Sequence, residues 1–241
     1  GHIILPLVDP EAWKRVFPQT KVAKVNGSYV AALPFDVKSV RLLKNRGYTL
    51  PSLLASYNWP GRFTPYEHQK ETTDFMVVNP RGYCLSGMGT GKSASALWAT
   101  DYLIRQGEVK KTLIVAPLST LDRVWAQEIF HVLPHRRFHI LHGSRAKRIE
   151  LLRDPKCDFY IINHDGVEII FDALAKRPDI NHVIADELAG YYRNSRTKRA
   201  KTMFQILNRQ GIPRSAWGLT GTPTPNAPTD CFGQIRLLTP E

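Results

Sequence analysis

The stretch Tyr83–Leu97, YCLSGMGTGKSASAL, constrains the fold of this 241-residue chain more than any other. The apolar run at its start predicts a strand, and the small and apolar residues after Ser93 predict a helix. Between them, Gly89 and Gly91 expose successive backbone N–H groups, which together with the helix N-terminus can wrap phosphate oxygens. The spacing departs from the usual pattern at Ser86, where a first glycine is expected. A phosphate-binding loop between a strand and a helix is therefore predicted.

The end of this loop carries its chemistry. Lys92 is expected to reach the β- and γ-phosphates of a nucleotide, and the Ser93 hydroxyl is expected to ligate Mg²⁺. The predicted nucleotide-binding residues of the loop are Met88, Gly89, Thr90, Gly91, Lys92 and Ser93.

Strand patterns alternate with helix patterns from about Phe63 onward. The expected strands lie within 82–86, 112–117, 137–142, 158–163, 182–186 and 216–221. The expected helices are Ser93 to Arg105, Thr120 to Val132, Arg145 to Arg153, Val167 to Ala175, Lys198 to Asn208 and Thr229 to Leu238. Several strands are apolar on both faces, which is typical of a parallel sheet covered by helices on both sides. The predicted fold is α/β with a doubly wound, mainly parallel sheet, and ligands of such sheets bind at the carboxyl ends of the strands.

An acid pair ends one of these strands, in the stretch HVIADELAG. Asp186 would hold Mg²⁺, mostly through water, and Glu187 would orient and deprotonate an attacking water. The alternative is the first turn of an ordinary surface helix, where two acids also lie favourably near the positive end of the helix. The pair alone does not separate these interpretations, but a phosphate loop in the same chain favours the metal-and-water site.

Residues 1–60 lack the regular alternation of strand and helix patterns. They predict a small α+β domain of ββα type, followed by the α/β domain at 61–241. Apolar and polar residues alternate around Asn26-Gly27, which predicts a hairpin with a type I′ turn. A helix is expected after Asp36, with an apolar face and a C-cap at Gly47. The segment from Thr49 to Pro65 is rich in proline and is expected to be a linker. The basic residues of the expected helix make a DNA contact plausible, and a purely bracing role is the alternative.

The formal charge of +12 predicts a polyanionic partner, since lysine and arginine contacts to phosphates supply most sequence-independent affinity for nucleic acids. A generally basic surface is the alternative. The three cysteines lie far apart in the sequence, which fits a reducing compartment. No apolar run approaches the length of a membrane span, so the cytoplasm is expected, meaning the host cytoplasm for a viral protein, or the nucleus for a eukaryotic one.

Six motifs in order resemble the first RecA-like lobe of a superfamily two helicase, and more narrowly the Snf-type DNA translocases and their viral relatives. The motifs are PYEHQ, SGMGTGKS, TLIVAPLSTLDRVWAQEI, FYIINHDGV, VIADELA and WGLTGTPTPN. The resemblance covers about Phe63 to Glu241. It implies a RecA-like P-loop lobe that binds Mg²⁺-ATP and contacts duplex or branched DNA in a monomeric motor. It also implies that Lys92, Asp186 and Glu187 are the catalytic residues.

The resemblance assigns further roles to particular positions. It implies that Gln69 reads the adenine edge, for which an amide that both donates and accepts is suited. It implies nucleic-acid backbone contacts by Pro117, Leu118, Ser119, Asn163 and His164, and coupling of hydrolysis to movement by Thr220, Gly221 and Thr222. Without the resemblance, Gln69 would be interpreted as a surface glutamine and the last segment as a plain turn.

Related enzymes hydrolyse ATP between two RecA-like lobes, the second of which supplies arginines to the transferred phosphoryl group. No second lobe is expected within these 241 residues, so the chain alone is expected to hydrolyse ATP poorly. The alternatives are an RNA helicase lobe and a non-catalytic nucleic-acid-binding module with a vestigial nucleotide site. Loss of Lys92, Asp186 or Glu187 would favour the latter, and all three are present.

Three further features remain open. The basic segment Arg193–Lys201 resembles a similarly placed segment of Snf-type proteins, and it is either a DNA contact or a solvated helix face. Trp98 and Trp125 lie among apolar neighbours and are expected in the core. Many relatives carry a histidine soon after the acid pair, whereas Leu188 and Ala189 offer no such hydrogen bond. The route from the acids to the coupling segment is therefore not predicted.

Overall fold

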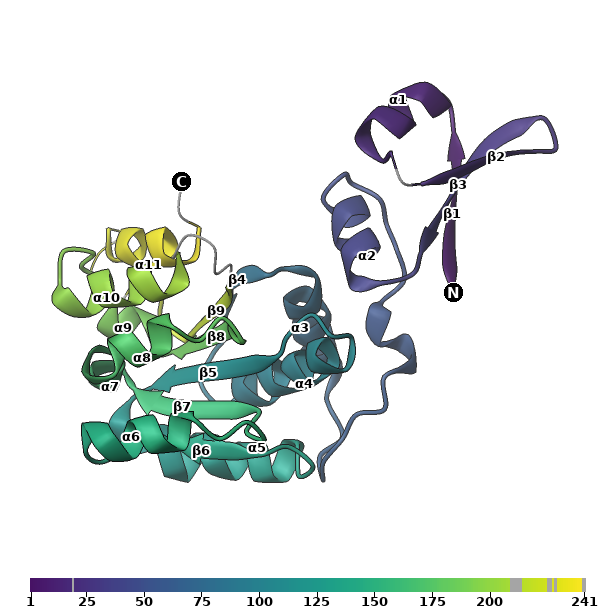
Figure 1. Cartoon of the computed structure of the whole chain (residues 1–241). Coiled ribbons are helices and arrows are strands. Elements are labelled where there is room, and N and C mark those ends of the chain that lie inside the picture. Colours follow the sequence, from purple (N-terminus) through teal and green to yellow (C-terminus); the bar gives the residue numbers. More distant parts are fainter. Residues whose placement is uncertain (19, 209–213, 225–226, 228, 240–241) are drawn as a thin grey trace. The chain divides into compact units, whose positions relative to one another are not determined.

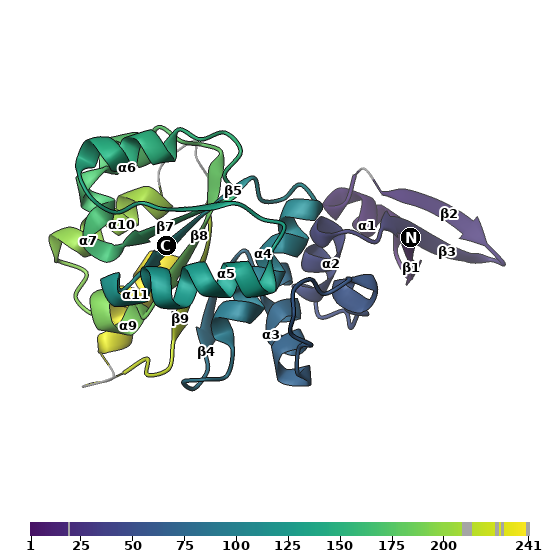
Figure 2. The ribbon, with the colours of Figure 1, turned by 90° about the horizontal axis from the view of Figure 1, so that it is seen from below.

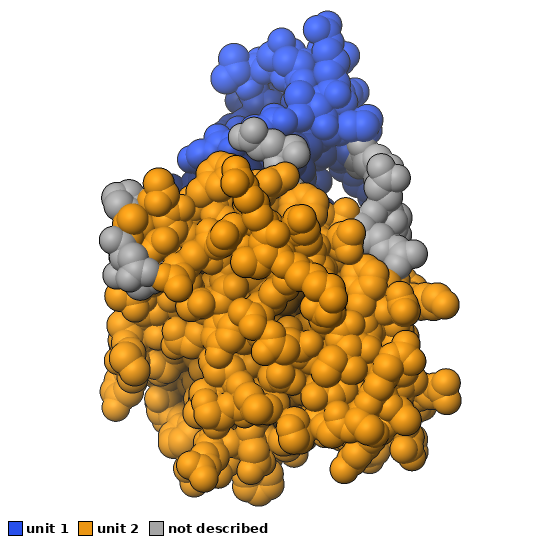
Figure 3. Space-filling view, turned by 90° about the vertical axis from the view of Figure 1, so that its left-hand side faces the viewer, with its two compact units in different colours: residues 1–57 blue, residues 58–241 orange. Residues whose placement is uncertain are grey.

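The computed structural model describes residues 1–18, 20–208, 214–224, 227 and 229–239 of the chain. It divides into two compact units, Gly1–Tyr57 and Asn58–Glu241, which are coloured separately in Figure 3. The sequence predicts the boundary after residue 60, whereas the packing ends the first unit at Tyr57. Part of the expected linker is folded, because Leu53, Leu54 and Tyr57 are all buried.

The first unit contains a three-stranded antiparallel sheet in the order β1-β3-β2 (Figure 1). Its elements are β1 (His2–Leu7), α1 (Pro10–Val16), β2 (Lys21–Val25), β3 (Ser28–Pro34), α2 (Val37–Lys44) and the 3₁₀ helix η1 (Leu53–Ser56). The predicted ββα order is therefore extended by β1 and α1. Strand β1 is not evident from the sequence because it forms by pairing with β3, with His2 opposite Pro34.

The hairpin and helix expected in this unit are confirmed, although the C-cap of the helix is Asn45 and not the expected Gly47. Asn26 and Gly27 have φ angles of 49° and 84°, as a type I′ turn requires at both central residues. Strand residues Val25 and Ser28 pair directly across this turn. Asp36 caps α2 by accepting a hydrogen bond from the backbone N–H of Ser39 at 2.8 Å.

The second unit is built on a six-stranded, all-parallel sheet in the order β4-β9-β8-β5-β7-β6 (Figure 1). The strands are β4 (Arg81–Leu85), β5 (Lys111–Ala116), β6 (Phe138–Ile140), β7 (Phe159–Asn163), β8 (Ile180–Asp186) and β9 (Ser215–Thr220). All six predicted strands are confirmed, as is the parallel α/β class. The last strand, β9, lies between β4 and β8, so strands far apart in the sequence are neighbours in the sheet.

Helices cover both faces of this sheet (Figures 1 and 2). They are α3 (Glu67–Val78), α4 (Lys92–Arg105), the 3₁₀ helix η2 (Leu118–Thr120), the π-helix η3 (Leu121–Ala126), α5 (Gln127–Val132), α6 (Arg145–Leu152), α7 (His164–Ile169), α8 (Phe171–Ala175), α9 (Leu188–Tyr191), α10 (Lys198–Leu207) and α11 (Asp230–Leu238). On one face, alternate strand residues such as Val115, Ile162 and Ala185 form a core with residues of α6 to α11. Intervening residues such as Ile114 and Ile184 are also fully buried, so the sheet is apolar on both faces.

Two predicted helices differ from those observed. The expected helix from Val167 to Ala175 is divided into α7 and α8, because the chain turns at Ile170, which is completely buried. The expected helix from Thr120 to Val132 begins as short 3₁₀ and π segments before it becomes α-helical.

The three cysteines, Cys84, Cys157 and Cys231, are all free thiols. Burial raises the pKa of the Cys157 thiol to about 12, so it stays protonated at neutral pH. Among the described residues, no helix combines the length and the apolar character needed to cross a membrane.

Candidate active site

The carboxyl ends of three adjacent strands bring the predicted site together. Strand β4 leads into the phosphate loop, β8 ends at the acid pair, and β9, which leads into the coupling segment, lies between them. The register places Leu85 opposite Thr220 and Asp186 opposite Leu219. Motifs far apart in the sequence are therefore neighbours at one edge of the sheet, where ligands of parallel α/β sheets bind.

The phosphate loop folds around the ammonium group of its own lysine. Lys92 Nζ donates hydrogen bonds to the carbonyl oxygens of Ser86 at 2.8 Å and Gly87 at 2.7 Å. Gly89 and Gly91 have φ angles of 76° and 77°, a left-handed conformation that favours glycine. Helix α4 begins directly at Lys92, so its N-terminal backbone N–H groups and a positive charge lie together. This arrangement suits a polyphosphate.

Gln69 lies against this loop, although it comes from the start of α3. Its Nε2 donates to the carbonyl oxygen of Thr90 at 3.3 Å, and its Oε1 accepts from the backbone N–H of Tyr66 at 3.0 Å. A Cβ on Gly91 would lie 2.0 Å from Gln69 Nε2, so the end of the glutamine side chain would have to move for any larger residue at this position. His68 also contacts Thr90 O, at 3.2 Å through Nε2, and the sequence analysis did not single it out.

The acid pair has an unusual backbone. Glu187 is exposed and adopts a left-handed conformation with φ 50° and ψ 42°, which costs a non-glycine residue about 1–2 kcal/mol. Asp186 Oδ1 accepts the backbone N–H of Glu187 at 3.0 Å. Neither acid caps the short helix α9 through its side chain. The pair thus stands at the start of a short helix, as the alternative also expects, but without a side-chain cap.

Trp125 is a site residue that the sequence analysis assigned to the core alone. Trp98 and Trp125 are both buried as expected, but Trp125 also donates its indole N–H to Asp186 Oδ2 at 2.9 Å. Burial raises the pKa of Asp186 and the charge of Glu187 adds to this, while the Trp125 hydrogen bond and Lys92 oppose it. Trp125 lies in a π-helix, a geometry that is rare and frequent at functional sites. That geometry has no recognised sequence pattern, so no local signal identified this role.

The segments after β5 and β7 differ in their accessibility. Leu118 and Ser119 are exposed, and Pro117 is half-buried, so this segment is available to a ligand. Asn163 accepts a hydrogen bond from Arg148 Nη1 at 3.2 Å through its Oδ1.

His164 lies inside the protein. Its side chain is 2% exposed, and its Nδ1 is hydrogen-bonded to the Tyr192 hydroxyl at 2.9 Å. The ring therefore faces the protein interior, and the expected nucleic-acid contact by His164 stays a prediction.

The coupling segment touches the phosphate loop directly. The backbone N–H of Ser86 donates to Thr220 O at 3.3 Å. Thr220 is 1% exposed, and its hydroxyl accepts from the backbone N–H of Thr222 at 3.3 Å, which shapes the turn around Gly221. The carbonyl oxygen of Pro223 accepts from Gln234 Nε2 of α11 at 2.9 Å. Pro225 and Asn226, the end of the predicted motif, lie outside the described residues.

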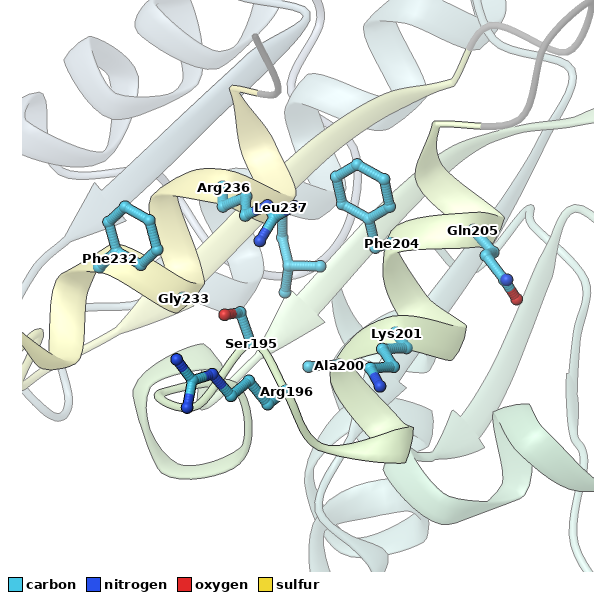
Figure 4. A pocket seen from close by; sticks show the side chains of 10 residues that line it. All are labelled: Ser195, Arg196, Ala200, Lys201, Phe204, Gln205, Phe232, Gly233, Arg236 and Leu237. Carbon is cyan, nitrogen blue, oxygen red and sulfur yellow. The ribbon is translucent and has the colours of Figure 1, made fainter.

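A pocket of about 400 Å³ lies between α10 and α11, and it contains no predicted catalytic or nucleotide-binding residue (Figure 4). Figure 4 shows Phe204 on α10 and Phe232 on α11, with Leu237 between them. The Arg236 guanidinium lies 5.6 Å from the centre of the Phe204 ring. The pocket is therefore an apolar hollow with basic residues at its edge, separate from the three strand ends.

The donor set fits a magnesium-bound nucleotide. Ser93 offers a hydroxyl and Asp186 a carboxylate, and Mg²⁺ prefers such oxygen ligands together with waters and substrate phosphates. Lys92 and the loop N–H groups supply the complement to phosphate charge. The residues present thus suit the cofactor that the sequence motifs imply.

This fold and site define a P-loop domain with a RecA-like parallel α/β sheet. Residues 68–241 match the SNF2-related domain family, and the chain belongs to that family. The predicted resemblance to Snf-type proteins is confirmed at this level.

One curated protein and two solved structures of another protein are similar to this chain. The putative protein p41 of Acyrthosiphon pisum secondary endosymbiont phage 1 is 30% identical over 183 residues, covering 73% of this chain and 39% of that protein. The Sulfolobus solfataricus SWI2/SNF2 ATPase core in complex with dsDNA has a similar fold, with 21% identity, a TM-score of 0.58, and coverage of 76% of this chain and 37% of that one. A second structure, of the Sulfolobus solfataricus SWI2/SNF2 ATPase core domain, has 22% identity and a TM-score of 0.55. The match covers 77% of this chain and 38% of that one. The chain therefore spans about two fifths of the length of these relatives.

Proposed function

We propose that this chain is the first motor lobe of an ATP-dependent DNA translocase. The observation that carries the proposal is the convergence of the phosphate loop, the acid pair and the coupling segment on β4, β8 and β9. A lobe of this kind binds Mg²⁺-ATP at one strand edge and contacts the DNA backbone with the neighbouring segments.

Each residue of the site has a proposed task. Lys92 and the loop N–H groups bind the phosphates, and Ser93 and Asp186 hold the metal, which neutralises charge on the transferred phosphoryl group. Glu187 orients the attacking water and accepts its proton. Gln69, already fixed beside Thr90, contacts the adenine. Trp125 orients the carboxylate of Asp186, which holds the metal, by donating a hydrogen bond to it.

DNA is the proposed polymer. The net charge of +12 favours a polyanion, and the relative from Sulfolobus solfataricus is described in complex with dsDNA. Exposed Leu118 and Ser119 and the basic segment Arg193–Lys201 are the proposed backbone contacts. Backbone contacts position a protein on a duplex and carry no sequence information.

The test is polymer-stimulated ATP hydrolysis by the natural full-length protein, with duplex DNA, RNA and no polymer compared at equal phosphate concentration. Stimulation by duplex DNA is expected, and Lys92→Ala should abolish it because the phosphates lose their cation. Equal or greater stimulation by RNA would favour the RNA helicase alternative. Normal turnover by Lys92→Ala would favour the non-catalytic alternative. The 241-residue chain alone should bind nucleotide but turn it over poorly.

A further inference from the structure

Three side chains from three separate segments stack on one another beside the acid pair. The rings of His164 in α7 and Tyr191 in α9 are nearly parallel, at 16°, with centres 3.7 Å apart. The guanidinium of Arg199 in α10 lies over the Tyr191 ring, 5.1 Å from its centre. We call this set the Arg199–Tyr191–His164 stack. It joins the end of β7, the helix after the acid pair and the basic segment.

The inner end of the stack is fixed next to the metal-binding acid. His164 Nδ1 is hydrogen-bonded to the hydroxyl of Tyr192, which is fully buried. Its Nε2 is also buried and has no hydrogen-bond partner among the described residues. Burial lowers the pKa of His164 to about 3, with Arg199 adding to this and the Asp186 backbone opposing it. The ring is thus neutral, and it acts by position rather than by charge.

The outer end of the stack is open to solvent. The Arg199 side chain is 35% exposed and pairs with Asp165, which is 68% exposed, through Nε at 2.9 Å. An exposed pair of this kind contributes little stability, so a phosphate can compete with the carboxylate for the guanidinium. The partner of Arg199 in the protein is Asp165, at a place that a phosphate oxygen of a polymer can reach from solvent.

In the sequence, Glu187 lies between Asp186 and the helix α9, which carries Tyr191 of the stack. Its left-handed backbone follows Asp186, whose backbone raises the pKa of His164, and precedes α9. A strained conformation persists only where the surroundings determine it, and here the stack fixes the chain on both sides of Glu187. A displacement of Tyr191 therefore acts on the residue proposed to orient the attacking water.

We infer that a nucleic-acid phosphate binds at Arg199, and that the Arg199–Tyr191–His164 stack transmits this binding event to the acid pair. A phosphate draws Arg199 from Asp165, the guanidinium shifts over Tyr191, and the stacked rings reposition Asp186 and Glu187. This inference rests on the proposed function, and it names Tyr191 and His164 as positioning residues rather than catalytic ones.

The first test removes the stack while keeping its neighbours. Tyr191→Leu in the natural full-length protein should lower the ratio of DNA-stimulated to DNA-free ATP turnover at saturating duplex DNA by about fivefold or more. The DNA concentration giving half-maximal stimulation should change less than twofold. Tyr191→Phe keeps the ring and should restore the wild-type ratio. Fluorescent-nucleotide affinity and the unfolding midpoint of both variants show whether the fold is retained.

The second test uses two adjacent cations of the same segment. Lys198 pairs with Glu168 at 2.5 Å and belongs to no stack, so it is a matched control for Arg199. Both Arg199→Gln and Lys198→Gln remove one charge and should raise the DNA concentration that gives half-maximal stimulation. Only Arg199→Gln should lower the ratio of DNA-stimulated to DNA-free turnover at saturating DNA.

The outcomes separate the two proposals. If the wild-type protein shows no stimulation by DNA, the proposed function and this inference both fail. If it is stimulated and Tyr191→Leu keeps the full ratio, or if the two charge variants behave alike at saturation, the stack has no reporting role while the proposed function stands.

Discussion

The lysine of the loop that ends β4 is held by carbonyl groups of its own loop, whereas the carboxylate that ends β8 is held by a side chain from a distant part of the sequence. Lys92 is held by the carbonyl oxygens of Ser86 and Gly87, only a few residues away. Asp186 Oδ2 accepts a hydrogen bond from Trp125, which is 61 residues away in the sequence. The two halves of one site are thus assembled by different means.

The difference teaches where each half is vulnerable. A lysine held by its own loop depends on the backbone conformation of that loop, so a change within the loop should damage nucleotide binding directly. A carboxylate oriented from a distance depends on packing, so the same damage can come from a residue that no motif contains. Matched substitutions at both halves test this comparison.

The largest effect is expected from Gly91→Ala. A Cβ there would lie 2.0 Å from Gln69 Nε2, and the φ of 77° is strained for alanine. The strain and the lost Gln69 contact together cost about 3 kcal/mol, or roughly a hundredfold in nucleotide affinity. Titration with a fluorescent ATP analogue measures this change.

Gly107→Ala is the control for that variant. Gly107 has a similar φ of 74°, but a Cβ there meets nothing within 4 Å. We expect a loss of about 1 kcal/mol in the free energy of unfolding and unchanged nucleotide affinity. If both variants bind nucleotide alike, the loop does not depend on its backbone geometry in the way argued.

A smaller effect is expected from Trp125→Phe, which keeps a ring in the core and removes the donor to Asp186. A hydrogen bond to a charged group is worth about 1.5–3 kcal/mol, so the Mg²⁺ concentration needed for half-maximal turnover should rise roughly tenfold. Trp98→Phe is the matched control, since Trp98 is equally buried but donates to the carbonyl oxygen of Pro60 at 3.1 Å. Equal Mg²⁺ dependence in the two variants would remove Trp125 from the site.

The smallest effect is expected from Thr220→Val, which removes the hydroxyl that accepts from the Thr222 N–H at 3.3 Å. The loss is about 1 kcal/mol in the free energy of unfolding, with nucleotide affinity changed less than about threefold. Thr112→Val is the control, because the buried Thr112 hydroxyl has no hydrogen-bond partner among the described residues. That variant should be neutral or more stable in denaturant titration, and a loss equal to that of Thr220→Val would contradict the assigned role of the turn.

The same contrast explains what the sequence predicts and what it does not. The phosphate loop and the Asn26-Gly27 hairpin are local, so residue type and spacing determine them. Strand β1 and the role of Trp125 depend on partners far along the chain, and a one-dimensional pattern carries no record of which partner packs where. His164 shows this most clearly, because its position in a motif suggested a surface contact while Tyr192, 28 residues later, holds it inside.

The position of β9 bears on how the lobe is made. In the sheet, β4 is an edge strand that pairs with β9, with Arg81 opposite Ala216. Strand β4 therefore has no neighbouring strand until β9 has been synthesised and has folded. Chains are synthesised from the N-terminus, and pairing across so long a separation is slow to form. The phosphate loop therefore acquires its final surroundings only late in folding. A nucleotide stabilises the form that it binds, so ATP should act on the completed lobe and leave earlier folding intermediates unaffected.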